Sequence, residues 1–223
     1  MRIDPITLEL IRNKFDVTAN EMQTSLIRSS YSSIVKEAFD ASSALFNIKG
    51  ETIAQATALP IHLGMLIPAV KKIIEVFPPF SDMNEGDIFV LNDPYEGGTH
   101  LPDIIMVTPV IYKGRPVALS CTITHHQDMG GRTPGSCSTE ATEIFQEGLR
   151  IPPIRLYDRG TLNKTLYQII ERNVRTPDIV LGDLRAQISA INTGKHRFLE
   201  LIEAYDIDTI LGCVEELLNY SEA

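Results

Sequence analysis

Two polar segments combine histidine, aspartate and glycine, residue types that bind metals and allow sharp turns. The segments are Asn92–Asp103 (NDPYEGGTHLPD) and Thr124–Gly131 (THHQDMGG), and they hold three of the chain's five histidines. Neutral imidazole and carboxylate oxygen form the ligand set of many catalytic divalent-metal sites. The sequence therefore indicates a metal site, provided that the fold brings the two segments together.

The chain between these segments has the pattern of a β-hairpin. Ile104–Ile111 (IIMVTPVI) and Val117–Thr124 (VALSCTIT) are rich in β-branched residues, and the intervening YKGRP is a turn sequence with a central glycine. If the loop is centred on that glycine, Asp103 lies directly opposite His125. Directly opposed residues share a face, with Cβ atoms about 5 Å apart, so both side chains can reach one ion.

The interpretation also depends on the position of His100 and on the register of the hairpin. His100 precedes Asp103 by three residues, across a Leu-Pro step that predicts a bend able to bring the histidine back toward the same point. A two-residue loop would instead slip the pairing by one and place a neighbour of His125 opposite Asp103. Pro109 also removes a ladder hydrogen bond unless it faces an edge. The alternative is a polar strand end whose histidines hydrogen-bond to nearby backbone.

Longer motifs run along nearly the whole chain. In order they read DPITLELIRNKF, IVKEAFDASSALF, LPIHLGML, LNDPYEGGTHLPD, HHQDMGGRTPGS and TEIFQEGLRIPP. Together they resemble the hydantoinase B/oxoprolinase family. That family includes the metal-bearing subunit of ATP-dependent N-methylhydantoinases and related lactam hydrolases, the C-terminal half of 5-oxoprolinases, and a subunit of acetone and acetophenone carboxylases.

The resemblance implies one divalent metal, Zn, Mn or Fe, held by two histidines and two aspartates. The matching positions are Asp40, His100, Asp103 and His125. Asp40 comes from the resemblance alone, because nothing in its local sequence demands a ligand. Near it the chain departs from the family pattern, with Ala38 in place of an arginine and Ser43 where cysteine is common.

The resemblance also implies a function. We expect a metal-dependent catalytic subunit of an ATP-dependent cyclic-amide hydrolase, acting on hydantoin or 5-oxoproline-type lactams. A hydantoinase A-type, actin-like ATPase subunit would phosphorylate the carbonyl oxygen, since the chain contains no phosphate-binding loop sequence. The alternatives are a ketone carboxylase subunit, or an inactive split fragment that acts as an assembly scaffold.

Length bears on those alternatives. Family subunits run to more than twice the 223 residues of this chain. Residues 1–223 are therefore expected to be the N-terminal portion of such a subunit, forming a single domain. The C-terminal half would be either a separate polypeptide or lost by truncation, and a hetero-oligomer is expected in either case.

Further polar residues are candidates for supporting roles. His126 and Asp128 are predicted to transfer protons or to hydrogen-bond to the ligands, although His126 should point away from His125, which makes a structural role equally compatible. The predicted substrate-binding residues are His62, Gly97, Gly98, Gly130 and Gly131. The alternatives are a core histidine and ordinary glycine turns.

Composition narrows the class of protein. The net charge of −9 and pI near 5.0 argue against a surface for nucleic acid or anionic membrane. The N-terminus lacks the apolar region of a signal peptide, and no apolar stretch is long enough to span a bilayer. Three cysteines without metal-type spacing indicate reduced thiols in the cytoplasm.

The periodicity predicts an α+β fold: a long N-terminal helix, an antiparallel hairpin-containing sheet that carries the metal site, and a helical C-terminal segment. Predicted helices cover residues 5–30, 61–76, 162–173 and 177–205, with a helix-like segment at 209–220. Predicted strands cover 34–46, 51–54 and 87–91 besides the hairpin. Residues 129–142 are expected to form a loop, and residues 144–149 a short strand or turn.

Overall fold

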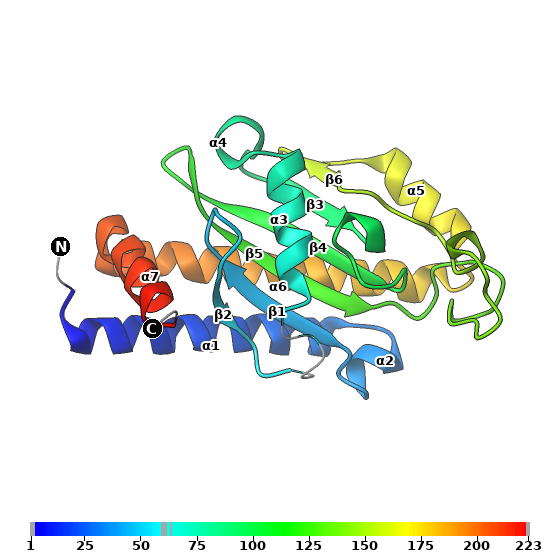
Figure 1. Cartoon of the computed structure of the whole chain (residues 1–223), viewed down its shortest axis with the longest axis horizontal. Helices are drawn as coiled ribbons and strands as arrows, with labels where there is room; N and C mark the ends of the chain where they lie inside the picture. The colour runs from blue at the N-terminus through cyan, green and yellow to red at the C-terminus, as the bar shows by residue number, and fades with distance from the viewer. Residues whose placement is uncertain (1–2, 59–61, 63, 222–223) are drawn as a thin grey trace.

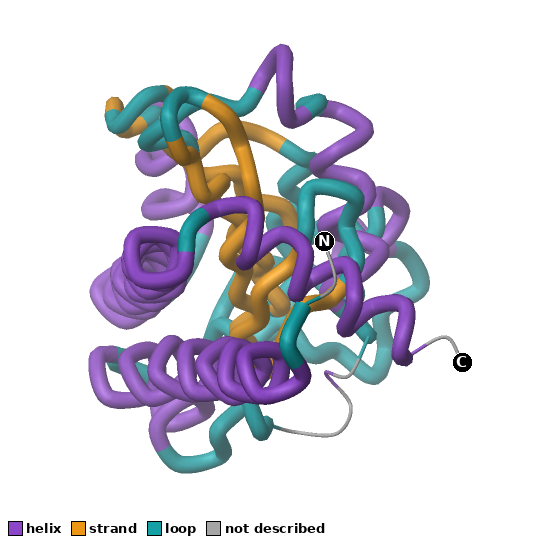
Figure 2. The backbone as a smooth tube through the Cα atoms, turned by 90° about the vertical axis from the view of Figure 1, so that its left-hand side faces the viewer, coloured by secondary structure: helices purple, strands orange, loops and turns teal. Residues whose placement is uncertain are grey.

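An antiparallel sheet lies between helices (Figures 1 and 2). The computed structural model describes residues 3–58, 62 and 64–221. Within this part the sheet has seven strands in the order β2-β1-β5-β4-β3-β6-β7, with every neighbouring pair antiparallel. The strands are β1 (Ala41–Phe46), β2 (Thr52–Gln55), β3 (Ile88–Leu91), β4 (Asp103–Tyr112), β5 (Arg115–His125), β6 (Ile154–Asp158) and β7 (Thr161–Leu162). The prediction of an α+β fold is confirmed.

Helices cover both faces of the sheet. They are α1 (Pro5–Ser29), α2 (Ser33–Lys36), α3 (Leu66–Val76), α4 (Pro79–Asp82), α5 (Lys164–Asn173), α6 (Pro177–Tyr205) and α7 (Ile207–Ser221). The long helices α1 and α6 lie side by side along one face, and α3 packs on the other (Figure 1). No helix in the described residues is both long and apolar enough to cross a bilayer.

Helix α1 forms where the sequence predicts it. Asp4 caps its start, accepting a hydrogen bond from the Thr7 backbone N–H at 3.0 Å, and a proline follows at the first helical position. Its buried stripe faces α6, where the ring of Phe15 stacks on that of Phe198 with 5.5 Å between centroids. This part of the core therefore joins a helix near the start of the sequence to a helix near its end.

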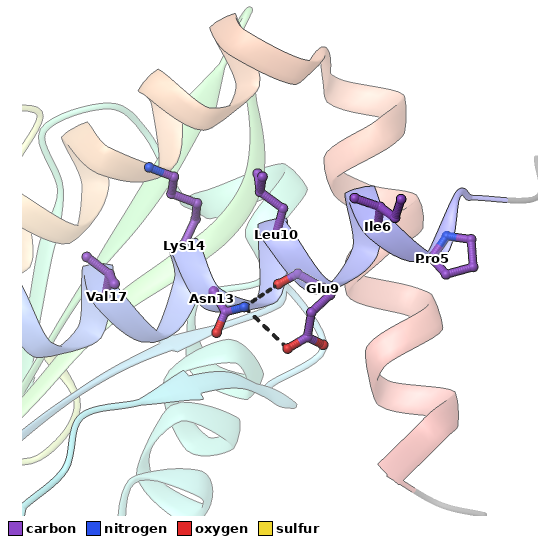
Figure 3. A pocket seen from close by; sticks show the side chains of 7 residues that line it. All are labelled: Pro5, Ile6, Glu9, Leu10, Asn13, Lys14 and Val17. Carbon is purple, nitrogen blue, oxygen red and sulfur yellow. Dashed lines mark hydrogen bonds between the residues drawn. The ribbon is translucent and has the colours of Figure 1, made fainter.

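The outer side of α1 carries a shallow hollow of about 580 Å³, shown in Figure 3. Its apolar floor comes from Ile6, Leu10 and Val17, while Asn13 hydrogen-bonds to Glu9 along the same helix. The hollow is lined by side chains of α1 and holds none of the histidines or aspartates discussed above. The predicted chemistry therefore lies elsewhere on the molecule.

The hairpin has the predicted register, but it reaches this register through a β-bulge that was not predicted. Asp103 pairs with His125, and the ladder continues in step to Val110 opposite Ala118. The loop contains only two residues, both at positive φ, as in a tight hairpin turn. Val117 is an extra residue on β5, because Ile111 pairs with the residue before it. This β-bulge compensates for the one-residue slip that a two-residue loop would impose.

Alternation along β4 separates two sets of core contacts. Ile105 and Val107 pack with α3, whereas Ile104 and Met106 pack with α5 and α6. The ladder between β3 and β4 ends at Val107, so Pro109 lies beyond it and interrupts no pairing with β3. Because Asp103 has the parity of Ile105, its side chain lies on the α3 side of the sheet.

Several predicted boundaries were wrong. The strand predicted over residues 34–46 begins only at 41, because Ser32 caps the short helix α2 by accepting a hydrogen bond from the Val35 N–H. The helix predicted over 61–76 begins at 66 as α3, and residues 61 and 63 lie outside the described residues. The helix predicted from 162 begins at 164, after β7, whereas residues 144–146 form one 3-10 turn, as one of the two alternatives for residues 144–149 predicted.

Candidate metal centre

The core of the site is the strand pair formed by Asp103 and His125. His125 Nδ1 lies 3.2 Å from Asp103 Oδ1, with both side chains on the α3 side of the sheet. Asp103 is nearly fully buried, with 3% of its side chain exposed, whereas His125 exposes 14%. The backbone holds this end of the hairpin closed, because the His126 N–H donates to the Pro102 carbonyl at 2.8 Å.

His100 returns to the same point through a tight turn. The Asp103 N–H donates to the His100 carbonyl at 2.9 Å, which confirms the bend predicted at the Leu-Pro step. His100 Nδ1 then lies 2.9 Å from Asp103 Oδ2, and the His100 and His125 rings are 4.9 Å apart between centroids. The Thr99 hydroxyl donates to the same Asp103 oxygen at 2.6 Å.

Asn92, which the sequence interpretation did not single out, holds the loop that carries His100. Its side-chain amide donates to the carbonyls of Leu101 and Leu149 at 2.7 and 2.9 Å, and its oxygen accepts from the Ile151 N–H at 2.6 Å. This fully buried asparagine therefore joins the loop before β4 to the segment before β6 and satisfies backbone groups that no strand pairs. Its position at the start of NDPYEGG was the one available signal.

Asp40 approaches the cluster from a third segment. Its carbonyl accepts from the His125 N–H at 3.0 Å, which places it at the start of β1 beside the end of β5. Its Oδ2 lies 3.9 Å from His125 Nδ1, and its Oδ1 lies 3.2 Å from Nε2 of His62. All four residues implied by the resemblance are therefore neighbours, together with the predicted pocket residue His62.

The charges of the cluster stabilise one another. Burial alone raises the pKa of Asp103, but the His100 and His125 rings and the Thr99 hydroxyl outweigh it and hold that pKa well below the ordinary range. The hydrogen bond to Asp103 in turn raises the pKa of His100, against the lowering effect of burial. Asp103 is therefore ionised at neutral pH, as a metal-ligating carboxylate must be.

The arrangement fits a divalent metal. One ligand atom from each of His100, Asp103 and His125 lies within 4.8 Å of the others, and Asp40 borders this trio. Asp103 Oδ1 is buried but has no aligned hydrogen-bond donor among the described residues, so its acceptor capacity is unused by the protein. Two imidazoles and two carboxylates suit Zn, Mn or Fe. The metal itself stays a prediction.

The two residues predicted to transfer protons lie apart from this trio. His126 follows the last residue of β5 and is fully buried on the α6 side of the sheet, with its Nε2 2.9 Å from the side-chain oxygen of Gln187. Asp128 is buried beyond the strand end and pairs with Arg175 at 2.9 Å. Both positions give these residues structural contacts, and their catalytic role stays a prediction.

The four predicted substrate-binding glycines are packed against protein backbone. A Cβ on Gly97 would lie 2.8 Å from the Pro68 carbonyl oxygen at the start of α3, and positive φ at Gly97 disfavours other residues. Cβ atoms at the other positions would likewise collide with backbone, and those positions are Gly98, Gly130 and Gly131. Close packing accounts for these glycines, and contact with a substrate is untested.

Sequence comparison identifies the family. The model of the hydantoinase B/oxoprolinase family matches residues 4–223, and the chain belongs to that family. Among its relatives, the B-type chain assigned to a D-/L-hydantoinase of Pseudomonas sp. (strain NS671) is 38% identical over 99% of this chain. The 5-oxoprolinase of Dictyostelium discoideum is 36% identical over 93% of it.

Solved structures show the same fold. The ATP-dependent caprolactamase from Pseudomonas jessenii matches 97% of this chain with a TM-score of 0.91 and 37% identity. Acetone carboxylase in its nucleotide-free form matches 95% with a TM-score of 0.88, and at 23% identity it supports the fold alone. The chain spans 38% of the hydantoinase relative, 16% of the oxoprolinase and 37% of the caprolactamase chain.

Proposed function

We propose that this chain is the metal-binding portion of a hydantoinase B-type component in an ATP-dependent hydrolase of cyclic amides. The observation that carries the proposal is the buried Asp103 flanked by His100 and His125 at the mouth of one hairpin. Family membership supports the substrate class, since the named relatives include a hydantoinase component, a 5-oxoprolinase and a caprolactamase.

The residues proposed to hold the metal are Asp40, His100, Asp103 and His125. When bound, a divalent ion there supplies Lewis acidity and activates water for attack on a carbonyl. Asp103 contributes a fixed negative charge at the floor of the site. The 44% exposed side chain of His100 and the 30% exposed side chain of Asp40 form its open rim. We infer that substrate enters across this rim.

ATP is proposed to act through a partner. An unstrained lactam carbonyl is a weak electrophile, and this sequence has no phosphate-binding loop. A hydantoinase A-type ATPase subunit would activate the carbonyl oxygen by phosphorylation, and this chain's residues would then position the activated amide for hydrolysis. The structural relative that is an ATP-dependent caprolactamase supports a requirement for ATP.

Elemental analysis tests the metal site. The chain purified without added metal should contain about one Zn, Mn or Fe per molecule, as expected for a single four-residue site. The His100→Ala/His125→Ala variant should contain none, and His196→Ala, which removes an exposed histidine on α6, should retain the metal. Full metal content in the double variant would refute the ligand assignment.

A second assay tests the reaction. The chain should be combined with an ATPase subunit and the remainder of a family subunit, then supplied with ATP and a hydantoin or 5-oxoproline. We expect ring opening that requires ATP and is lost in the double variant. Turnover of a ketone that requires bicarbonate, with no opening of cyclic amides, would instead establish the carboxylase alternative.

A further inference from the structure

Asp40 is the one proposed ligand whose side chain the hairpin does not position. Its backbone is fixed by hydrogen bonds to His125 and Ile34, but its carboxylate extends from the residue before β1. Its Oδ2 is 3.9 Å from His125 Nδ1, and it stands outside the compact trio. A second contact must therefore orient this carboxylate.

We propose that His62 is a positioning residue for Asp40, holding one carboxylate oxygen so that the other faces the metal trio. His62 Nε2 lies 3.2 Å from Asp40 Oδ1, while Oδ2 of the same carboxylate lies on the His125 side. The inference rests on the proposed metal site. It assigns His62 to orienting a ligand, in place of the substrate contact expected from the sequence.

The surroundings of His62 determine which ring nitrogen donates. Its side chain is only 3% exposed, and its Nδ1 is buried with no hydrogen-bond partner in the part of the chain that the structure describes. A neutral imidazole carries a single N–H, and burying that group without an acceptor is unfavourable. The proton is therefore favoured on Nε2, where the Asp40 carboxylate accepts it.

The backbone of His62 is tied to the strand that follows Asp40. The side-chain amide of Gln55, at the end of β2, donates to the His62 carbonyl at 3.1 Å and to the Ser42 hydroxyl at 3.3 Å. Ser42 lies on β1, two residues after Asp40. One amide thus links the histidine to the strand beside the carboxylate it orients, which sets the distance between them.

Contacts of this kind tune metal affinity. Groups that hydrogen-bond to metal ligands fix ligand orientation, and their removal typically costs about 10- to 100-fold in metal affinity. His62→Ala should weaken binding by this factor, measured by competition with a chromophoric chelator using Zn²⁺. Glutamine places an amide N–H near the position of Nε2, so His62→Gln should restore most of the affinity. His196→Ala is the matched control on an exposed surface.

A double-mutant cycle separates orientation from general structural support. If His62 acts through Asp40, then His62→Ala in an Asp40→Ala background should cause no further loss of affinity. The Co²⁺-substituted protein supplies a second readout, because the visible spectrum reports the ligand set and should change in His62→Ala but not in the control. Far-ultraviolet circular dichroism checks that each variant is folded.

The outcomes distinguish failure of the positioning role from failure of the metal site. Unchanged affinity in His62→Ala, together with loss of binding in His100→Ala, overturns the positioning role and leaves the proposed function intact. Equal losses in the alanine and glutamine variants, or additive losses with Asp40→Ala, also overturn it. If the unaltered chain binds no Zn²⁺, both the metal site and this inference fail.

Discussion

Asp128 provides a test of whether a buried carboxylate beyond the end of β5 supports structure or catalysis. Its Oδ1 accepts from the Gly135 N–H at 3.1 Å and Arg175 Nη1 at 2.9 Å. Its Oδ2 accepts from the Gly130 N–H at 3.1 Å and the Arg175 N–H at 2.7 Å. These contacts join the glycine-rich loop to the residues that precede α6.

The cost of Asp128→Asn follows from those contacts. Asparagine retains one acceptor oxygen, so about two charge-assisted hydrogen bonds are lost, each worth roughly 1.5–3 kcal/mol, and an amide N–H₂ is placed against two donors. The side chain of Arg175 is 39% exposed, which screens part of the loss. We expect destabilisation of about 3 kcal/mol, or a fall of about 1 M in the urea midpoint at an m-value near 3 kcal/mol/M.

The pH dependence has a defined sign. Burial raises the pKa of Asp128, but hydrogen bonds from Arg175, Gly135 and Gly130 outweigh it and lower that pKa. The stabilisation is therefore fully present above the unfolded pKa of about 3.9 and is lost as pH falls through the lower folded value. The unfolding free energies of wild type and Asp128→Asn should differ at pH 7 and approach each other as the pH falls below about 4.

Urea unfolding followed by circular dichroism checks both expectations, with Asp16→Asn on the exposed side of α1 as the control. Equal stability of wild type and Asp128→Asn at pH 7 would refute the reasoning. If such a stable variant also lost turnover in the reconstituted enzyme, a catalytic role for Asp128 would be supported instead.

Two further perturbations probe the scaffold. Deletion of Val117 removes the extra residue of the β4–β5 ladder, so Asp103 should stay opposite His125. The metal content in elemental analysis should therefore be unchanged, and loss of metal would contradict this account. Gln187→Leu should lower the unfolding free energy by about 2 kcal/mol, since it removes the side-chain partner of the buried His126 Nε2 and a second donor to the Ile104 carbonyl. An unchanged urea midpoint would show that these groups find other partners.

The hairpin could be predicted because its signals are local. Two runs of β-branched residues around a central glycine indicate the strands, and centring the loop on that glycine placed Asp103 opposite His125. The details of the loop were harder to predict, since a two-residue turn with a bulge gives the same register as a symmetric loop. Both solutions keep the apolar residues facing the core, and burial selects register more strongly than turn type.

The missed features combine one local helix cap with long-range contacts. Ile34 and Val35 have strand propensity, yet a cap from Ser32 makes the segment helical, and the Asp183 carboxylate accepts hydrogen bonds from the N–H groups of Tyr31 and Ser32. Asp183 lies about 150 residues along the chain from these partners, a separation that no local pattern reveals. Asp40 belongs to the same category, since only the family resemblance indicated it.

His125, the last residue of β5, and His126, which follows it, show what residue type alone leaves undecided. Both have the chemistry of a ligand, but consecutive side chains of a strand point to opposite faces. His125 therefore joins Asp103 on the α3 side, whereas His126 is buried against Gln187 on the α6 side, where burial lowers its pKa. Register separates the two histidines, so the correct strand pairing was the step on which the whole site prediction depended.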